Sequence, residues 1–196
     1  MFAHFTELVS SASGWAYGIV FLLALLDAFI PVVPSETALI TAGVVAASGD
    51  LSLPLVILAG AGGAFAGDNI SYLIGRQFGP GVVERFGGKK GRSRIEWAKR
   101  QLRERGVQLI LVGRFIPGGR TAVTLTAGLT RFGWRRFLPA DAAAALAWAV
   151  FASLLGYFGG RAFEDAPWKG LLLALGIGFA LGGAVELVRH LRKRFG

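Results

Sequence analysis

The chain has 196 residues, of which 54% are hydrophobic and 17% are charged. Soluble domains carry about 25% charged residues, so this composition excludes an ordinary soluble protein and predicts a single integral membrane domain over residues 1–196. The formal net charge is +9, but nine of the 21 Lys and Arg residues lie between positions 85 and 105, and four more between 189 and 194. Because these charges flank apolar segments, they indicate membrane orientation and anionic lipid as a partner rather than nucleic acid. The chain has no cysteine, which excludes disulfides and thiol chemistry.

The N-terminal residues 1–13 are mixed in character and predict a short surface helix. No Lys or Arg precedes the first apolar run, so the basic start of a signal peptide is missing and we expect this end to be retained. An N-terminus without positive charge fits a location on the outer side of the membrane, whereas a complete first span would place it inside.

A first apolar segment is broken by prolines. Residues 15–30 are apolar except for Asp27, and residues 37–48 are apolar again after a break marked by Pro31 and Pro34. Each half is shorter than the roughly 20 residues that a transmembrane helix needs. Two short halves around a proline break predict a re-entrant helical hairpin. A complete first span that ends at Asp27 is the alternative.

A full span is predicted over residues 53–75, which are apolar and long enough to cross a bilayer. Ala59, Gly63 and Gly67 follow one another at intervals of four residues, so they share one face of the helix. Small side chains on one face allow the backbone of another helix to approach closely.

The basic segment at residues 80–106 follows this span. Ile95, Ala98 and Leu102 form a narrow apolar stripe on a helix that is otherwise covered by charge. This pattern is typical of an amphipathic helix that lies at the membrane interface, and its positive charge predicts the cytoplasmic side.

Two arginines lie inside the next apolar segment, residues 107–130. Arg114 and Arg120 stand on either side of a break formed by Pro117, Gly118 and Gly119. An arginine near the bilayer centre costs roughly 2.5–3.5 kcal/mol on insertion scales, so two of them require a purpose. A broken helix survives in lipid only where it packs in protein or lines a wet cavity. We therefore expect a second re-entrant hairpin whose tip carries cationic groups.

The two halves of the chain resemble each other at a nearly constant spacing. Phe29-Ile30-Pro31 recurs 86 positions later, and three further matches recur 85 positions later: Ala42-Gly43 as Ala127-Gly128, Leu53-Pro54 as Leu138-Pro139, and Tyr72-x-x-Gly75-Arg76 as Tyr157-x-x-Gly160-Arg161. One full crossing separates the copies, so the second is expected to be inverted. Inverted repeats with broken helices are typical of transporters, whose site lies between the repeats at the midplane.

Two further spans are predicted over residues 137–160 and 168–188. The expected organisation is a first repeat at about 14–79, a basic cytoplasmic loop at 80–106, a second repeat at about 107–163 and a C-terminal transmembrane helix at about 168–190 with a cytoplasmic end. The predicted fold is thus all-α and polytopic, with two opposed hairpins.

Six charged side chains in these apolar segments form the candidate site. The predicted substrate-binding residues are Arg114, Arg120, Glu36 and Asp68. The residues predicted to carry protons or gate the site are Glu36, Asp68, Asp27 and Asp141. A guanidinium matches a phosphate bidentately, and buried acids titrate, so the set suits a proton-coupled site for an anionic headgroup. The alternative is that Glu36–Arg120 and Asp68–Arg114 are ion pairs that only hold the fold.

At these residues the chain resembles the DedA family, also called the VTT or SNARE-associated Golgi protein group. The resemblance covers about residues 14–163 and rests on Phe29-Ile-Pro-x-x-Pro-Ser-Glu36, Gly67-Asp68-Asn-x-x-Tyr72-x-x-Gly75-Arg76 and Gly113-Arg114-Phe-x-Pro117-Gly-x-Arg120 followed by Ala127-Gly128. Family members often have a second proline where Thr124 stands here, so we expect the second half of the later hairpin to be more regular than usual.

The resemblance implies opposed re-entrant hairpins and lipid translocation in a bacterial cytoplasmic membrane. Bacterial relatives move undecaprenyl phosphate or phosphatidylethanolamine, eukaryotic relatives scramble phospholipids, and a proton-motive requirement is implied by relatives. In the family the hairpin acids and arginines are important, which corresponds here to Glu36, Asp68, Arg114 and Arg120. The favoured function is a flippase for a polyprenyl phosphate. The alternatives are a phosphatidylethanolamine flippase or scramblase and a proton-coupled small-ion or drug antiporter.

An enzyme is disfavoured by the residues themselves. Lipid-phosphate hydrolysis needs a nucleophile and a base, and the chain offers no cysteine and only the terminal histidines His4 and His190. We expect no cofactor and no metal site. A membrane assembly factor without transport, or a homo-oligomer built on the small-residue faces, stays open at this point.

Overall fold

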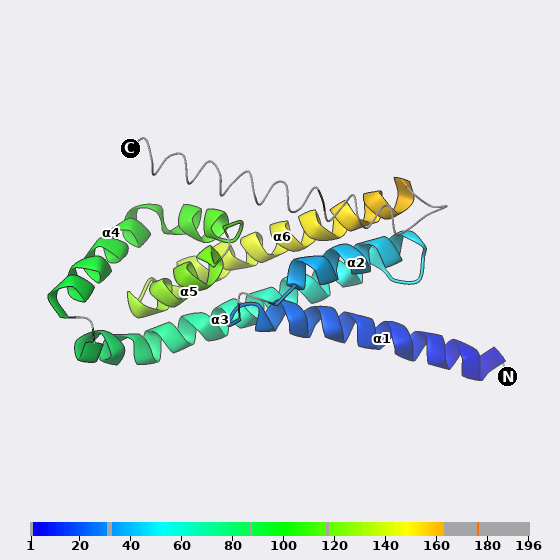
Figure 1. Cartoon of the computed structure of the whole chain (residues 1–196), viewed down its shortest axis with the longest axis horizontal. Coiled ribbons are helices and arrows are strands. Elements are labelled where there is room, and N and C mark those ends of the chain that lie inside the picture. The colour runs from blue at the N-terminus through cyan, green and yellow to red at the C-terminus, as the bar shows by residue number, and fades with distance from the viewer. Residues whose placement is uncertain (1, 31–32, 87, 117, 163–175, 177–196) are drawn as a thin grey trace.

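A computed structural model of the chain describes residues 2–30, 33–86, 88–116, 118–162 and 176. This part is helical and has no strand (Figure 1). The helices are α1 (Phe2–Leu26), α2 (Ser35–Ala47), α3 (Leu53–Phe86), α4 (Gly88–Gly113), α5 (Gly119–Leu129) and α6 (Trp134–Ala162). The span expected at residues 168–190 and the prolines Pro31 and Pro117 lie outside the described residues.

Two helices, α3 and α6, are long and apolar enough to cross a membrane. The qualifying segments are Leu53–Gly79, with 27 residues, and Trp134–Ala162, with 29 residues. They contact each other and run in opposite directions (Figure 1). The spans expected at 53–75 and 137–160 are therefore confirmed as helices, and both are a few residues longer than expected.

Helix α1 is continuous from Phe2 to Leu26, so residues 2–13 do not form a separate surface helix. That expectation was wrong because nothing in this stretch stops a helix: it contains no Pro and no Gly. The small-residue face of α3 is confirmed, since α1 packs directly against it. A Cβ on Gly63 would overlap the carbonyl oxygen of Phe21, and one on Gly67 would lie 2.5 Å from that of Leu25.

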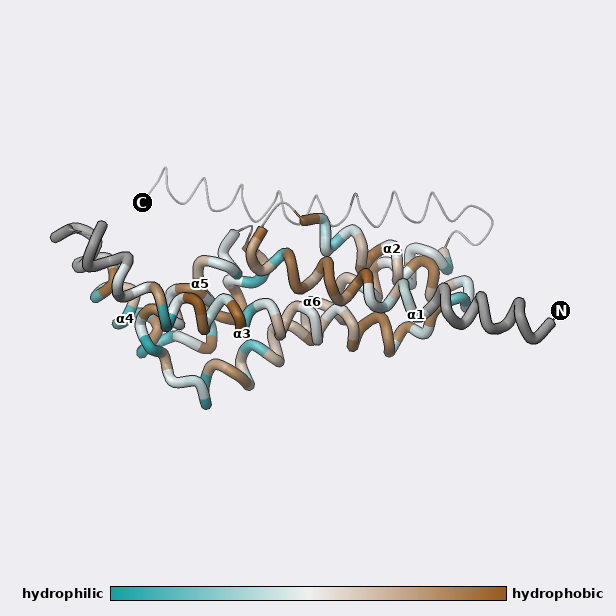
Figure 2. Tube along the Cα trace, turned by 90° about the horizontal axis from the view of Figure 1, so that it is seen from below, coloured by the Kyte–Doolittle hydropathy of each residue, from teal (hydrophilic) through white to brown (hydrophobic). Residues whose placement is uncertain are grey.

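The basic segment is also helical. Leu102 is buried in the second apolar cluster, and Ile95 and Ala98 are partly buried, so part of the apolar stripe packs against the protein, whereas the sequence predicted a helix at the membrane interface. Hydrophilic residues gather at the end of the molecule that carries α4 (Figure 2). Arg105, with φ −134° and ψ 23°, interrupts the helical backbone close to the expected boundary between the basic loop and the second repeat.

The short helices α2 and α5 each pack against the long helix of the other half. A Cβ on Gly43 of α2 would overlap the Ser153 carbonyl of α6, and one on Gly128 of α5 would overlap the Tyr72 carbonyl of α3. Gly43 and Gly128 are 85 residues apart, so the packing repeats at the spacing of the sequence repeat. With 13 and 11 residues, α2 and α5 are about 20 and 17 Å long, shorter than the roughly 30 Å of a bilayer's hydrocarbon core.

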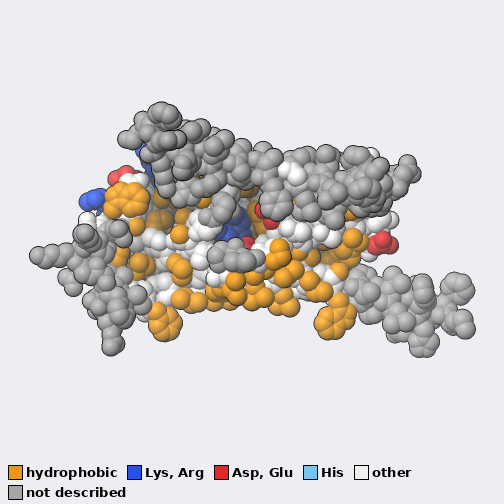
Figure 3. Space-filling model, in the orientation of Figure 1, with side chains coloured by type: hydrophobic (Ala, Val, Ile, Leu, Met, Phe, Trp, Pro, Cys, Tyr) orange, Lys and Arg blue, Asp and Glu red, His pale blue; other side chains and the backbone are white. Residues whose placement is uncertain are grey.

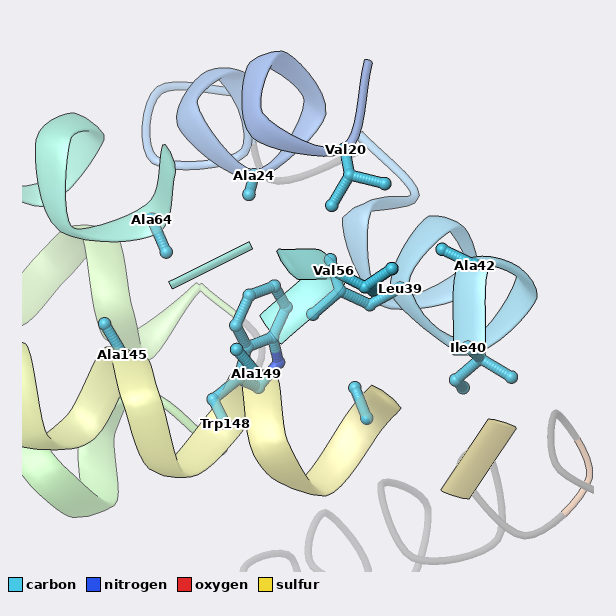
Figure 4. Packing of buried hydrophobic residues seen from close by; sticks show 11 residues of the cluster. Val20, Ala24, Leu39, Ile40, Ala42, Val56, Ala64, Ala145, Trp148 and Ala149 are labelled. Carbon is cyan, nitrogen blue, oxygen red and sulfur yellow. The ribbon is translucent and has the colours of Figure 1, made fainter. Parts of the chain in front are cut away.

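Two apolar clusters hold the helices together. The first places Trp148 of α6 among side chains of α1, α2 and α3, as Figure 4 shows for Val20, Leu39 and Val56. The second joins α3, α4, α5 and α6 around Tyr72 and Phe137, whose rings stack with centroids 4.6 Å apart. Large apolar side chains also cover much of the described surface (Figure 3), which suits a lipid-facing exterior.

Candidate functional site

A tight turn between α4 and α5 places two arginines in the interior. Arg114 directly follows the last residue of α4, and Arg120 is the second residue of α5. Gly118 lies between them at φ +68°, a left-handed conformation that glycine adopts at little cost. Both arginines are buried, each with 8% of its surface exposed.

Asp68 on α3 is the centre of the site. It is fully buried, and each of its carboxylate oxygens serves a different arginine. Nη1 of Arg114 donates to Oδ2 at 2.6 Å, and Nε of Arg120 donates to Oδ1 at 2.7 Å. One acid therefore balances part of the positive charge of both guanidiniums, whereas the sequence predicted a pair with Arg114 alone.

Arg120 has further partners on every side. Its Nη1 donates to Oδ2 of Asp27 at 3.0 Å, and its Nη2 donates to the carbonyl oxygens of Ala24 at 3.2 Å and Ala64 at 3.1 Å. Asp27 in turn accepts a hydrogen bond from the Ser35 hydroxyl at 2.9 Å. These contacts join the end of α1, the start of α2, and α3 to α5.

Arg114 has a different environment. Its guanidinium lies 5.5 Å from the ring centre of Trp148, and its Nη1 is 3.5 Å from Oδ1 of Asp141 on α6. Asn69 donates to the other Asp141 oxygen at 3.3 Å. The Nε and Nη2 atoms of Arg114 are buried and make no hydrogen bond within the described part of the chain, and the same holds for Oδ1 of Asp141 and Oδ1 of Asn69.

The expected ion pair between Glu36 and Arg120 does not form. Glu36 is in the first turn of α2 and its side chain is exposed, while Arg120 contacts Asp27 and Asp68 instead. Successive helical residues point about 100° apart, so the start of α2 turns Ser35 toward the site and Glu36 away from it. The pair expected between Asp68 and Arg114 is present.

The structure thus brings together five of the six candidate residues and adds three polar or aromatic partners. Ser35 and Asn69 lie in the motifs that the sequence had marked, next to Glu36 and Asp68. Trp148 was missed, although it follows Asp141 by seven residues, two helical turns, and so shares its face of α6. Its aromatic ring offers a face on which a guanidinium can stack.

The charge of the cluster does not balance. Asp27, Asp68 and Asp141 are three acids, whereas Arg114 and Arg120 are two bases. Unpaired buried charge is costly, so the closed cluster is neutral only when one acid carries a proton. Figure 3 shows basic and acidic side chains in a hollow near the middle of the described face, and the Asp27 side chain is 21% exposed. Among the side chains that the structure describes, no group of three is arranged to hold a metal ion.

Comparison with known proteins identifies the family. A family model described as the VTT domain matches residues 30–158. Protein DedA of Escherichia coli (strain K12) is 28% identical over 196 residues, covering 96% of this chain and 90% of the relative. Inner membrane protein YohD of the same strain is 35% identical over 133 residues, 68% of this chain and 67% of the relative.

A further relative is the uncharacterized membrane protein slr0232 of Synechocystis sp., which is 33% identical over 153 residues, 76% of this chain and 70% of the relative. No solved structure matches the chain. The VTT model spans more than half of the chain and includes Asp68, both buried arginines and Asp141. The chain therefore belongs to the DedA family of VTT-domain membrane proteins.

Proposed function

We propose that this protein moves a lipid with a phosphate headgroup across the cytoplasmic membrane, with a polyprenyl phosphate such as undecaprenyl phosphate as the favoured substrate. The observation that carries the proposal is the pair of buried guanidiniums, Arg114 and Arg120, held by Asp68 between two apolar membrane-length helices. Each arginine at such a depth costs roughly 2.5–3.5 kcal/mol on insertion scales. A phosphate is one of the anions that a guanidinium matches with two parallel hydrogen bonds.

The proposed architecture is a pair of inverted repeats with opposed re-entrant hairpins. The end of α1 with α2 forms one hairpin, and the end of α4 with α5 forms the other. The support is the short length of α2 and α5, the repeated glycine packing at an 85-residue offset, and the opposite directions of α3 and α6 (Figure 1). The basic loop at residues 80–106 and the C-terminus lie on the cytoplasmic side under the positive-inside rule.

The proposed mechanism exchanges one anion for another. In the resting cluster, carboxylates contact both guanidiniums; in the loaded cluster, a lipid phosphate binds at one of them. Protonation of an acid weakens its hold on an arginine, which couples proton entry to headgroup binding. The surplus of acids over bases supports this coupling, because the cluster has a place for one proton before any lipid binds. Glu36, exposed beside the cluster, extends the acidic path toward solvent.

A proton-coupled antiporter of small ions or drugs is the second candidate. The same surplus acid favours it, since proton exchange needs a titratable carboxyl whatever the cargo. The name of the relative Inner membrane protein YohD supports the inner membrane as the location, and neither its name nor that of Protein DedA distinguishes the cargo.

The test is headgroup accessibility in proteoliposomes that contain the full chain. A labelled polyprenyl phosphate and a fluorescent phosphatidylethanolamine are compared with and without a pH gradient across the vesicle. We expect the polyprenyl phosphate to change leaflet faster than in protein-free vesicles, and the gradient to accelerate it further. Movement of both lipids without any gradient effect would indicate a scramblase. Movement of neither lipid would refute the proposal and leave the antiporter as the better candidate.

A further inference from the structure

We propose that the two buried arginines have separate tasks: Arg114 supplies the edge that binds the anion, and Arg120 fastens the helices around it. The identity of the anion as a lipid phosphate rests on the proposed function. The division of tasks rests on the hydrogen bonds that each guanidinium already makes.

Arg120 has no edge left to offer. Its Nε is bound to Asp68, its Nη1 to Asp27, and its Nη2 to two backbone carbonyl oxygens. Asp68 and Ala64 belong to α3. Ala24 belongs to α1, and Asp27 directly follows that helix. Because Arg120 itself is on α5, its side chain ties three helices together. Displacing them for a ligand would break four hydrogen bonds that tie α5 to α3 and to the end of α1.

Arg114 has the complementary arrangement. Only its Nη1 is engaged at hydrogen-bond distance, by Asp68. Only 3% of the side chain is exposed, yet its Nε and Nη2 atoms have no hydrogen-bond partner within the described residues. These two nitrogens form one edge of the planar guanidinium, and their N–H bonds point in parallel. That edge matches two oxygens of a phosphate.

Two acceptor atoms near Arg114 also lack a hydrogen-bond donor, which a headgroup could supply. Oδ1 of Asp141 and Oδ1 of Asn69 are buried acceptors without a donor in the described structure. A phosphate monoester that carries one proton offers an O–H donor next to its charged oxygens, which fits a guanidinium edge flanked by free acceptors. The indole of Trp148 lies over the guanidinium and closes the site from the side of α6.

The experiment measures binding and stability of the full chain in detergent, with a C15 isoprenyl monophosphate as the probe and the matching alcohol as its control. In Arg114→Lys the charge stays and the bidentate edge is lost, so we expect about ten- to a hundredfold weaker binding with a nearly unchanged unfolding temperature.

In Arg120→Lys we expect a clearly lower unfolding temperature, while the folded fraction binds the probe within about threefold of wild type. Asp27→Asn removes the negative charge from one Arg120 partner and serves as the milder variant if Arg120→Lys does not fold; it is expected to lower the unfolding temperature without weakening binding.

Three results would overturn the division of tasks: weaker binding in Arg120→Lys or Asp27→Asn at an unchanged unfolding temperature, wild-type binding in Arg114→Lys, or equal loss of binding in all variants. A second probe, inorganic phosphate, separates this inference from the proposed function. If wild type binds phosphate but not the isoprenyl phosphate, and Arg114→Lys alone abolishes phosphate binding, the division holds and the lipid substrate is wrong. If wild type binds neither probe, both are wrong.

Discussion

Replacing Asp68 by asparagine tests how strongly the buried arginines depend on one acid. The substitution keeps the shape of the side chain and removes the charge that serves Arg114 at 2.6 Å and Arg120 at 2.7 Å. Asp141 and Asp27 still balance the charge of Arg114 and Arg120 in this variant, so the expected cost is that of the hydrogen bonds. Asparagine keeps one acceptor oxygen, and the loss of the other charged hydrogen bond costs about 1.5–3 kcal/mol. For a chain of this size, 1 kcal/mol corresponds to about 2–4 °C, so we expect the unfolding temperature to fall by about 3–12 °C.

The assay is thermal unfolding of the purified full chain in one detergent. Asp50→Asn is the matched control, because Asp50 is an exposed acid in the turn between α2 and α3, and a surface change of this kind usually stays within about 0.5 kcal/mol. The double variant Asp68→Asn with Arg114→Gln removes one charge of each sign and should lose less than the sum of the two single variants. An unfolding temperature of Asp68→Asn that matches the Asp50→Asn control would refute the central position that we give to this acid.

Three glycines give predictions that are independent of the charges. Gly128→Ala should destabilise the protein by about 1–3 kcal/mol, because the new methyl group meets the Tyr72 carbonyl and α5 must move off α3; Gly14→Ala, with open space around it in α1, should instead stabilise by about 0.5–1 kcal/mol. Equal unfolding temperatures for these two variants would contradict the close packing of α5 on α3. Gly118→Ala should cost about 1–2 kcal/mol through backbone strain alone, since φ is +68° and nothing lies near the added atom. Chemical unfolding of Gly118→Ala beside Gly14→Ala checks this value, and a cost near zero would mean that the turn relaxes.

The helices of this protein could largely be predicted from the sequence, because the relevant signals are local. The apolar runs at residues 53–75 and 137–160 predicted both long helices, and the four-residue spacing of Gly63 and Gly67 predicted the face that α1 covers. The break between Arg114 and Arg120 was evident from its glycines and proline. Thr124 keeps the helix intact, as expected, and its hydroxyl donates to the Arg120 carbonyl at 3.0 Å within an uninterrupted α5.

The partners inside the site could not be predicted from the sequence, because they depend on how helices are aligned against one another. Asp68 was expected to pair with one arginine and contacts two, while Glu36 was expected to pair and is exposed. A difference of one residue at the start of α2 decides whether Ser35 or Glu36 faces Asp27. Spacing along a helix determines which residues share a face, but the translation of one helix along another determines which atoms meet.

The most direct test of the lipid-transport claim is the rate at which a polyprenyl phosphate changes leaflet in proteoliposomes that contain wild type, Arg114→Ala or Arg103→Ala. Arg103 is an exposed arginine on α4 and controls for the loss of one positive charge. The account predicts that wild type and Arg103→Ala move the lipid at similar rates, while Arg114→Ala, shown to be folded by its unfolding temperature, falls to the protein-free rate. Transport by folded Arg114→Ala at the wild-type rate would contradict the account.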